Sequence, residues 1–370
     1  MTLQLHSGAV RRFAKAMKFG NWLQSLPNKV IPAPFRLIQI GSAYWQSKAL
    51  AVAARLDIAT VLGADTLEAS VLARRVDANA DALGRLMRML AAMGVFEEVG
   101  PMAFRNNKLS RCLARSHPQS VRAMILMHNS DAMSCPWFEQ LEAGIRSGTP
   151  PFQLSHGEEL FDYLDHHPDL DQLFSEAMDS VESLAGDGFA TDLDWGQFDR
   201  VIDVGGSRGT KALAILKQHP NLRALIVDRP QVVAEAQRYW ASHPTTGVER
   251  LRFQVGDLFE AIPAATGPKD IYLLSAVLHS FDNGTCIRAL KKLGEAMGSS
   301  SARAAVLEMV LPETGADIAS ASFDMQMFAG CRGRERTMTE WHSVIKGAGL
   351  VLEEVVRLRS LGSILVLRRP

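Results

Sequence analysis

The sequence predicts an α/β protein whose carboxyl-terminal half is a doubly wound sheet and whose amino-terminal half is mainly helical. From about residue 35 to 190, apolar residues recur at helical spacing, as in "LGRLMRMLAAMGVF". After Trp195, short β-rich apolar runs such as "DRVIDVGG", "LRALIVD" and "KDIYLLSAVLH" alternate with helix-length segments. That alternation is typical of parallel strands joined by crossover helices.

The helical half contains one segment with strand character. "VFEEVGPMAFRNN" indicates a β-hairpin around Gly100 and Pro101, after a helix that should end near Gly94. Helices followed by a hairpin look like a winged-helix unit, which suggests DNA binding. The helix in "DANADALGRLMRMLAAM" has only two arginines, which favours a buried subunit interface over a DNA groove. Its apolar residues are Leu83, Leu86, Leu90 and Met93.

Two strands end the chain. "LVLEEVVRLRS" and "LGSILVLRRP" are separated by a short turn at Leu361 and Gly362. The last strand should therefore run antiparallel to its neighbour. Together with the five earlier runs, which also include "RLRFQVGD" and "ARAAVLEMVL", the carboxyl-terminal half has seven expected strands.

The composition excludes several classes of function. Lysine and arginine together number 40, as do aspartate and glutamate, so no global positive field steers the chain onto nucleic acid or an anionic membrane. No apolar run approaches the roughly 18 residues of a membrane span, and the first residues lack the apolar stretch of a signal peptide. We expect a cytoplasmic protein with a small-molecule or protein partner.

The cysteines agree with a reduced compartment. They are far apart and never form C-x-x-C, which argues against a zinc site, a redox pair and a disulfide framework. At the amino terminus, basic residues alternate with apolar ones and could form an amphipathic helix for a membrane surface. An arm packing on the body or on a second subunit is the favoured interpretation. The cysteines are Cys112, Cys135, Cys286 and Cys331.

A glycine-rich turn follows the first strand of the carboxyl-terminal half, in "VIDVGGSRGTKALAI". Its letters match the G-x-S-x-G elbow of α/β-hydrolases, with Ser207 as nucleophile, but the helical half offers no oxyanion-hole segment. The dinucleotide fingerprint G-x-G-x-x-G also fails, because Ser207 and Thr210 stand where its second and third glycines belong. The turn therefore indicates a nucleoside ligand other than a dinucleotide.

Two acidic residues flank this turn. Asp203 lies two residues before Gly205, and Asp228 closes the next strand, 19 residues beyond Gly209. That distance suits a carboxylate that accepts hydrogen bonds from both hydroxyls of a ribose. An acid beside the glycines suits a ligand with positive charge and no pyrophosphate. S-adenosylmethionine, with its adenosine, sulfonium and ammonium groups, has this chemistry.

Six segments then carry a family resemblance: "DVGGSRGT", "IVDRPQVVAEA", "GDLFEAIP", "LLSAVLHSFDN", "LEMVLPE" and "GRERTMTEWHSVIKGAGL". In this order they resemble the class I S-adenosylmethionine-dependent small-molecule O-methyltransferases. These include the plant caffeate and flavonoid enzymes and bacterial antibiotic-tailoring enzymes. The resemblance covers nearly the whole chain, from about residue 36 to 368.

The resemblance implies a Rossmann-like sheet of seven strands, the last antiparallel, with an N-terminal winged-helix-like dimerisation domain. It implies an N-terminal arm over residues 1–35, the dimerisation domain over 36–115, a helical linker lining the acceptor pocket over 116–194, and the catalytic domain over 195–370. A homodimer is implied as well, and the apolar helices of the first hundred residues favour one.

The resemblance also implies cofactor-binding residues and no metal. Gly205 would line the methionine end of S-adenosylmethionine, Asp228 would bind the ribose, and Asp257 with Leu258 would meet the adenine. Many relatives have a cofactor-contacting lysine four residues before the histidine of the motif, and this chain has serine there. The remaining positions are Asp203, Gly206, Ser207 and Ser275.

His279 follows "YLLSAVL" at the carboxyl end of an expected strand, where open α/β sheets place their ligands. A lone histidine there is by default an exposed loop residue. The resemblance implies instead a general base, which takes the proton of a phenol whose pKa is about 10. It also implies Glu308 and Glu335 as partners of the other ring nitrogen. Glu308 could equally face water at a strand end, and Glu335 could belong to the charged run "RGRER".

The acceptor pocket is expected to come mainly from helices before Trp195. Aromatic and methionine residues at helical spacing are more often plain core, although methionine adapts to flat rings. His128, Asn129 and Asp131 suit contacts to polar substituents of the substrate and suit a surface turn equally well. The candidate substrate-binding residues are Trp137, Phe138, Phe174, Met178, Asp282 and Met327.

The expected function is an S-adenosylmethionine-dependent O-methyltransferase acting on a hydroxyl of an aromatic or polyketide-like molecule in secondary metabolism. The segment "HSFDN", which departs from the family's His-Asp-Trp, and Ser275 motivate a rival interpretation, an enzyme of the same fold. This rival binds the cofactor but catalyses decarboxylation, hydroxylation or a pericyclic reaction. A second rival is a winged-helix regulator with a ligand domain, which would bind duplex DNA with a steep salt dependence.

Overall fold

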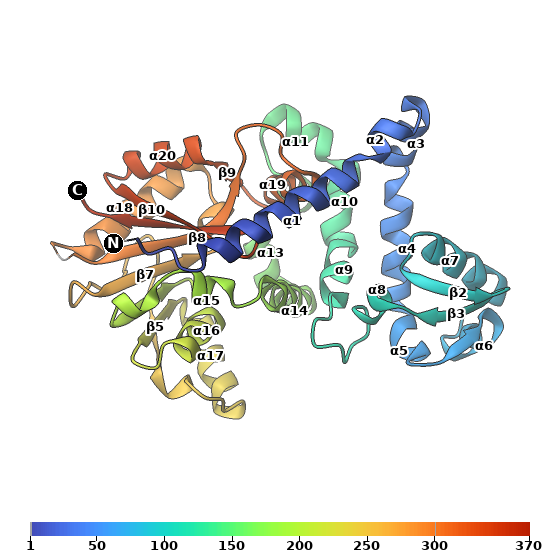
Figure 1. Ribbon diagram of the computed structural model, residues 1–370, viewed down its shortest axis with the longest axis horizontal. Helices are drawn as coiled ribbons and strands as arrows, with labels where there is room; N and C mark the ends of the chain where they lie inside the picture. Colours follow the sequence, from blue (N-terminus) through green and yellow to red (C-terminus); the bar gives the residue numbers. More distant parts are fainter. Residues whose placement is uncertain (1, 300) are drawn as a thin grey trace. The chain divides into compact units, whose positions relative to one another are not determined.

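The computed structural model describes residues 2–299 and 301–370, without the side chains of residues 182–185. The chain divides into two compact units, each drawn in Figure 1. The helical unit comprises Trp22–Leu184, and the sheet unit comprises Met1–Asn21 with Ala185–Pro370. Helix α1 (Ser7–Ser25) crosses the boundary between them.

The first part of the helical unit has a small antiparallel sheet of order β1-β3-β2. Its hairpin β2–β3 confirms the expected one around Gly100. The preceding helix α7 starts where the Asn79 side chain accepts from the Ala82 N–H at 3.0 Å, and it buries Leu83 and Leu90. The elements are α2 (Pro27–Val30), α3 (Ala33–Gly41), α4 (Ala43–Arg55), α5 (Ile58–Leu62), β1 (Thr66–Glu68), α6 (Ala69–Arg75), α7 (Ala80–Ala92), β2 (Phe96–Gly100), β3 (Ala103–Asn106) and α8 (Lys108–Arg111).

The second part of the helical unit is entirely helical where the structure describes it. Phe152, Leu160 and Leu164 form its buried core, and Phe174 packs against them. The elements are α9 (Arg122–His128), α10 (Asp131–Glu139), α11 (Leu141–Ser147), α12 (Pro151–His156), α13 (Leu160–His166) and α14 (Pro168–Ala185).

The sheet unit alternates strands and helices, as the sequence predicts. Its strands are β4 (Arg200–Val204), β5 (Arg223–Asp228), β6 (Leu251–Val255), β7 (Asp270–Ser275), β8 (Arg303–Leu311), β9 (Arg336–Thr337), β10 (Val351–Arg357) and β11 (Gly362–Arg368). Its helices after α1 are α15 (Gly188–Asp192), η1 (Trp195–Gln197), α16 (Thr210–Gln218), α17 (Pro230–Ser242), η2 (Val248–Arg250), η3 (Leu278–Ser280), α18 (Asn283–Met297), α19 (Ile318–Gly330) and α20 (Met338–Gly347).

Seven of these strands form the main sheet in the order β10-β11-β8-β7-β4-β5-β6, and β9 pairs with the end of β8. All pairs are parallel except those of β11, which runs antiparallel to both β8 and β10. Helices cover both faces with their apolar sides: α15 and α16 pack on one face, α18 and α20 on the other (Figure 1). Central strands buried on both faces need continuous apolar runs, as in "DIYLLS" of β7.

The first residues of the chain pack on the sheet unit. Leu3 is buried in the core that includes α15 and α16, and its N–H donates to Glu354 Oε2 at 2.8 Å. The N–H of Leu5 donates to the carbonyl of Asp192 at 2.7 Å. Throughout residues 2–299 and 301–370, every helix is too short or too polar to cross a membrane.

The strand order creates a switch point between β4 and β7. The chain leaves β4 to build β5 and β6 on one side, and it returns to build β7 and β8 on the other. Helical connections diverge at such a point, and open α/β sheets bind ligands outside the carboxyl ends of the strands there. The candidate residues described next lie along this edge.

Candidate active site

The glycine turn after β4 has a backbone that only small residues allow. Gly205 and Gly209 have φ of 74° and 75°, the left-handed region that favours glycine. A Cβ at Gly206 would lie 2.6 Å from the carboxyl carbon of Asp203, so a side chain there would collide with that buried acid. The turn therefore folds its backbone tightly over the Asp203 carboxylate, which is 2% exposed.

Ser207 has φ of 51°, in the same left-handed region. Its N–H donates to Asp228 Oδ2 at 2.9 Å, and the N–H of Arg229 donates to Asp228 Oδ1 at 2.8 Å. The carboxylate at the end of β5 thus fixes the turn after β4. Each of its oxygens still has a lone pair to offer, so the half-buried Asp228 can accept two further hydrogen bonds.

The next two strands bring further expected residues to the same edge. Asp257 lies two residues beyond the end of β6, and its Oδ1 accepts from the Phe259 N–H at 2.7 Å. Leu258 packs against the core on the α18 side of the sheet. Ser275 is the last residue of β7, and its buried Oγ has no hydrogen-bond partner among the described residues.

These residues fit S-adenosylmethionine. A ribose needs acceptors for two hydroxyl donors, and the Asp228 carboxylate retains that capacity. A sulfonium and an ammonium are stabilised by a nearby anion such as Asp203, and the glycine turn is exposed at Gly205 and half-buried at Gly206. When bound, S-adenosylmethionine supplies a methyl group on a positively charged sulfur.

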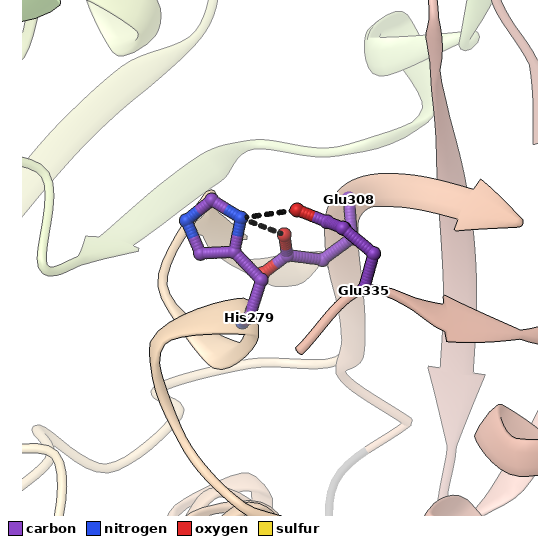
Figure 2. Close-up of side chains that lie close together, drawn as sticks. All are labelled: His279, Glu308 and Glu335. Atoms are coloured by element: carbon purple, nitrogen blue, oxygen red, sulfur yellow. Dashed lines mark hydrogen bonds and ion pairs between the residues drawn. The ribbon is translucent and has the colours of Figure 1, made fainter. Parts of the chain in front are cut away.

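His279 lies in η3, just beyond the end of β7, and contacts two carboxylates (Figure 2). Its Nδ1 lies 2.8 Å from Glu335 Oε1, which is hydrogen-bond distance, and 3.6 Å from Glu308 Oε2. Both carboxylates approach the Nδ1 side of the ring, and Nε2 points away from them (Figure 2). Both glutamates are buried beside the histidine and do not face water, since Glu308 is 2% and Glu335 1% exposed.

Glu308, on β8, holds the turn that carries the histidine. Its Oε1 accepts from the backbone N–H groups of Val277 at 3.1 Å, Leu278 at 2.8 Å and His279 at 3.4 Å. Burial raises the pKa of Glu308, and the negative charge of Glu335 adds to this, whereas His279 and the backbone donors oppose it. The carboxylate therefore acts both as a cap for η3 and as a charge beside the imidazole.

Glu335 reaches the ring from a loop that lies against the histidine backbone. Its N–H donates to Asp324 Oδ1 of α19 at 2.9 Å, and the N–H of Arg334 donates to the carbonyl of His279 at 2.8 Å. A Cβ at Gly333 would lie only 2.0 Å from that same carbonyl oxygen. Glycine is required at this position by the close approach of two backbones.

The environment of His279 sets its protonation. Burial lowers the pKa of the imidazole, but Glu308 and Glu335 together outweigh burial and the opposing charge of Arg336, so the pKa is raised above its usual value. A hydrogen on Nδ1 is held by Glu335, which leaves the lone pair of the neutral ring on Nε2. A histidine held in this way can accept a proton at Nε2.

The same three side chains present one nitrogen and two oxygens within 4.8 Å of one another, a donor set that divalent metals also accept. In this structure, direct contacts already engage these atoms: Nδ1 with Glu335, and Glu308 Oε1 with three backbone donors. These contacts account for the geometry through hydrogen bonding alone.

Two of the expected substrate-binding residues lie in the sheet unit. Asp282 is exposed and caps α18, where its Oδ1 accepts from the Thr285 N–H at 2.8 Å, and this hydrogen bond lowers the pKa of Asp282. Met327 is half-buried on α19, one turn beyond Asp324, so it shares a helix face with the residue that anchors Glu335.

The other four belong to the helical unit. Trp137 and Phe138 are 38% and 60% exposed on α10. Phe174 packs in the core of that unit, and Met178 is half-buried on α14. Their part in an acceptor pocket remains a prediction.

Sequence reasoning missed three residues that build this site: Asp324, Gly333 and Arg336. The run "RGRER" looks like a solvated charge cluster, yet Glu335 and Arg336 within it are buried. Gly333, the second residue of that run, is the one local signal, since a glycine between charged residues can mark a close backbone approach.

Comparison with known families agrees with the fold. Residues 138–351 match the O-methyltransferase domain, and residues 38–116 match the O-methyltransferase dimerisation domain. The chain belongs to the O-methyltransferase family. It is therefore an S-adenosylmethionine-dependent methyltransferase of small molecules in secondary metabolism, which sets aside the winged-helix regulator.

Individual relatives span almost the full chain. The phenazine O-methyltransferase of Lysobacter antibioticus is 30% identical over 92% of this chain and 97% of its own length. The phenazine-1-carboxylate N-methyltransferase of Pseudomonas aeruginosa is 30% identical over 90% and 96%. A solved O-methyltransferase of neocarzinostatin biosynthesis, in complex with S-adenosylmethionine and 2-hydroxy-5-methyl naphthoic acid, has a TM-score of 0.73, with 28% identity over 88% of this chain and 96% of that one.

Proposed function

We propose that this enzyme transfers the methyl group of S-adenosylmethionine to a hydroxyl of an aromatic or polyketide-like molecule, with His279 as general base. The observation that carries the proposal is the pairing of Nδ1 with Glu335 at 2.8 Å, which directs the lone pair of the neutral ring to Nε2. A phenol has a pKa of about 10, so it needs a base to become a strong nucleophile near neutral pH.

Each partner of the histidine has a separate part in this reaction. As the hydroxyl loses its proton to Nε2, the ring gains a positive charge that Glu335 stabilises through a charge-assisted hydrogen bond. Glu308 adds a second negative charge 3.6 Å from Nδ1 and fixes the η3 backbone. The departure from the family motif at "HSFDN" leaves these contacts in place, which supports retained methyl transfer.

The cofactor would be held by the residues around the glycine turn. We assign the ribose to Asp228, the positive charges to Asp203 with the backbone of Gly205, Gly206 and Ser207, and the adenine to Asp257 with Leu258. Ser275 stands where relatives use a lysine, and its unpartnered Oγ is available to a ligand. No metal takes part in this scheme.

The acceptor pocket and the dimer complete the proposal. We assign the acceptor to Trp137, Phe138, Phe174 and Met178 of the helical unit together with Asp282 and Met327. The dimerisation-domain match supports a homodimer, as do large apolar side chains on α3 that are more than half exposed. These are Phe35, Leu37, Ile38 and Ile40.

An amine acceptor is the second candidate, because one of the relatives named above is an N-methyltransferase. The first experiment incubates the enzyme with S-adenosylmethionine and a panel of phenolic, enolic and aromatic amine acceptors. Mass spectrometry then measures S-adenosylhomocysteine and the mass of each product. Turnover on hydroxyls that falls at least about a hundredfold in His279→Ala supports the proposal. Turnover on amines alone, with no loss in His279→Ala, overturns it.

A further inference from the structure

Arg336 is a buried charged residue at this site to which the proposed mechanism gives no role. It opens β9 directly after Glu335, and none of its surface is exposed. A guanidinium stays charged at every pH that a folded protein tolerates. Burial of such a charge is costly unless its donors are satisfied.

The guanidinium holds the segment that carries His279. Nη1 donates to the carbonyl of Leu278 at 3.2 Å, and Nη2 donates to the carbonyl of Phe281 at 2.5 Å. Nε donates to Asn283 Oδ1 at 2.8 Å. These acceptors lie on both sides of the histidine in the sequence. The planar guanidinium, whose Nε, Nη1 and Nη2 donors form a rigid fork, therefore fixes the whole turn of residues 278–283.

The same side chain ties this turn to the loop of Glu335. Nη1 also donates to the carbonyl of Arg334 at 3.3 Å, while the N–H of Arg334 donates to the carbonyl of His279 at 2.8 Å. The face of the guanidinium lies over Trp341 of α20, with its carbon 5.2 Å from the ring centroid. Arg336 thus donates hydrogen bonds both to the turn of His279 and to the loop of Glu335, and the hydrogen bond between His279 and Glu335 depends on these contacts.

Arg336 also adds a positive charge that no carboxylate neutralises directly. Its four acceptors are neutral oxygens, and no ion pair to it lies within the described part of the chain. Its charge opposes the rise that Glu308 and Glu335 cause in the pKa of His279. It likewise lowers the pKa of the Cys286 thiol on α18, which burial nonetheless raises to about 11.

The other charged side chains around this site have partners of their own. Arg334 pairs with Glu340 at 2.6 Å, and Asp324 accepts from the backbone of Glu335. The charges that act on the imidazole are thus two carboxylates and one guanidinium. Removal of the guanidinium leaves the two negative charges unopposed.

We propose that Arg336 is a positioning residue for the base: it locks the turn of His279 onto the loop of Glu335, and its positive charge offsets the two carboxylates beside the imidazole. The inference rests on the proposed function, since it requires His279 to act as the base.

Three variants separate the two parts of the proposal. Arg336→Gln removes both the charge and the fork, whereas Arg336→Lys keeps the charge and loses the fork. Arg250→Gln is the matched control, because Arg250 also donates to carbonyl groups: those of Leu216, His219, Pro220 and Leu222. That cluster does not include the segment of residues 278–283.

The first measurement is the titration of the His279 imidazole by NMR in the full-length enzyme, with the resonance assigned by its loss in His279→Gln. We expect Arg336→Gln to raise the pKa of His279 above the wild-type value, because the opposing positive charge is gone. Arg336→Lys and Arg250→Gln should leave that pKa close to the wild-type value. An unchanged pKa in Arg336→Gln overturns the electrostatic part.

The second measurement is the pH profile of kcat and kcat/KM. Arg336→Lys should lower kcat about tenfold or more without moving the acidic limb, and S-adenosylhomocysteine affinity by calorimetry should stay near wild type. Wild-type kcat in Arg336→Lys overturns the positioning part, whether or not Arg336→Gln folds. If His279→Gln itself retains turnover, the proposed function fails, while the NMR titration still tests the effect of Arg336 on the imidazole.

Discussion

Replacement of Gly333 by alanine tests the geometry of the active site most sharply. Cβ atoms do not approach other atoms closer than about 3.0 Å, and the new Cβ would start 2.0 Å from the carbonyl oxygen of His279. It would also lie 2.8 Å from both the carbonyl carbon and the Cα of Ser280. All three contacts are with backbone, so the loop and the turn must separate by about 1 Å.

A displacement of this size acts directly on the base. The hydrogen bond between His279 and Glu335 is 2.8 Å long, and an extension of about 1 Å breaks it. Misplacement of a reacting group by about 1 Å costs on the order of a hundredfold in rate. We therefore expect Gly333→Ala to lower kcat about a hundredfold.

The assay is S-adenosylhomocysteine formation at saturating cofactor, with cofactor affinity measured separately by calorimetry. Gly267→Ala is the matched control, because a Cβ at Gly267 would meet no atom within 4 Å. The control should keep wild-type kcat, and both variants should bind S-adenosylhomocysteine as the wild type does. A Gly333→Ala enzyme with wild-type kcat would refute the argument that this close approach sets the position of the base.

Three further predictions concern charge, cofactor and metal. Because the two carboxylates raise the pKa of His279, kcat/KM should rise with pH and reach half its plateau at a pH above about 6.5, the ordinary pKa of histidine. Glu335→Gln removes one of these charges, so in a pH profile of kcat/KM it should shift the rise to lower pH and lower the plateau. Gly206→Ala should weaken S-adenosylhomocysteine binding at least about tenfold in calorimetry, since its Cβ collides with the Asp203 carboxylate. Prolonged dialysis against EDTA should leave kcat unchanged, and loss of activity restored by one divalent metal would contradict the metal-free scheme.

The sequence predicts the sheet and its ligand-binding edge because these depend on local patterns. Short continuous apolar runs, such as that of β7, can be recognised in the sequence as strands that are buried on both faces. The parallel arrangement brings the carboxyl ends of neighbouring strands together, so Asp203, Asp228 and Ser275 could be expected on one edge. Short strands are different: β1 and β9 have three and two residues, too few for a periodic pattern.

The contacts of the base could not be read from local pattern. Glu335 lies 56 residues from His279 in the sequence, and only the family resemblance pairs them. The run "RGRER" has the composition of a solvated surface, whereas tertiary packing buries Glu335 and Arg336 within it. The tight contact at Gly333 likewise depends on a turn that a distant segment supplies, so nothing in the adjoining residues specifies it.

The most direct test of the account compares two phenolic acceptors of the same shape. One has an ordinary pKa of about 10, and the other carries ring fluorines that leave it ionised at the assay pH. We would measure kcat/KM for wild type and His279→Gln with both. The account predicts a loss of at least about a hundredfold with the ordinary phenol and little loss with the ionised one, which has no proton to give. Equal losses with both acceptors would contradict the assignment of His279 as the general base.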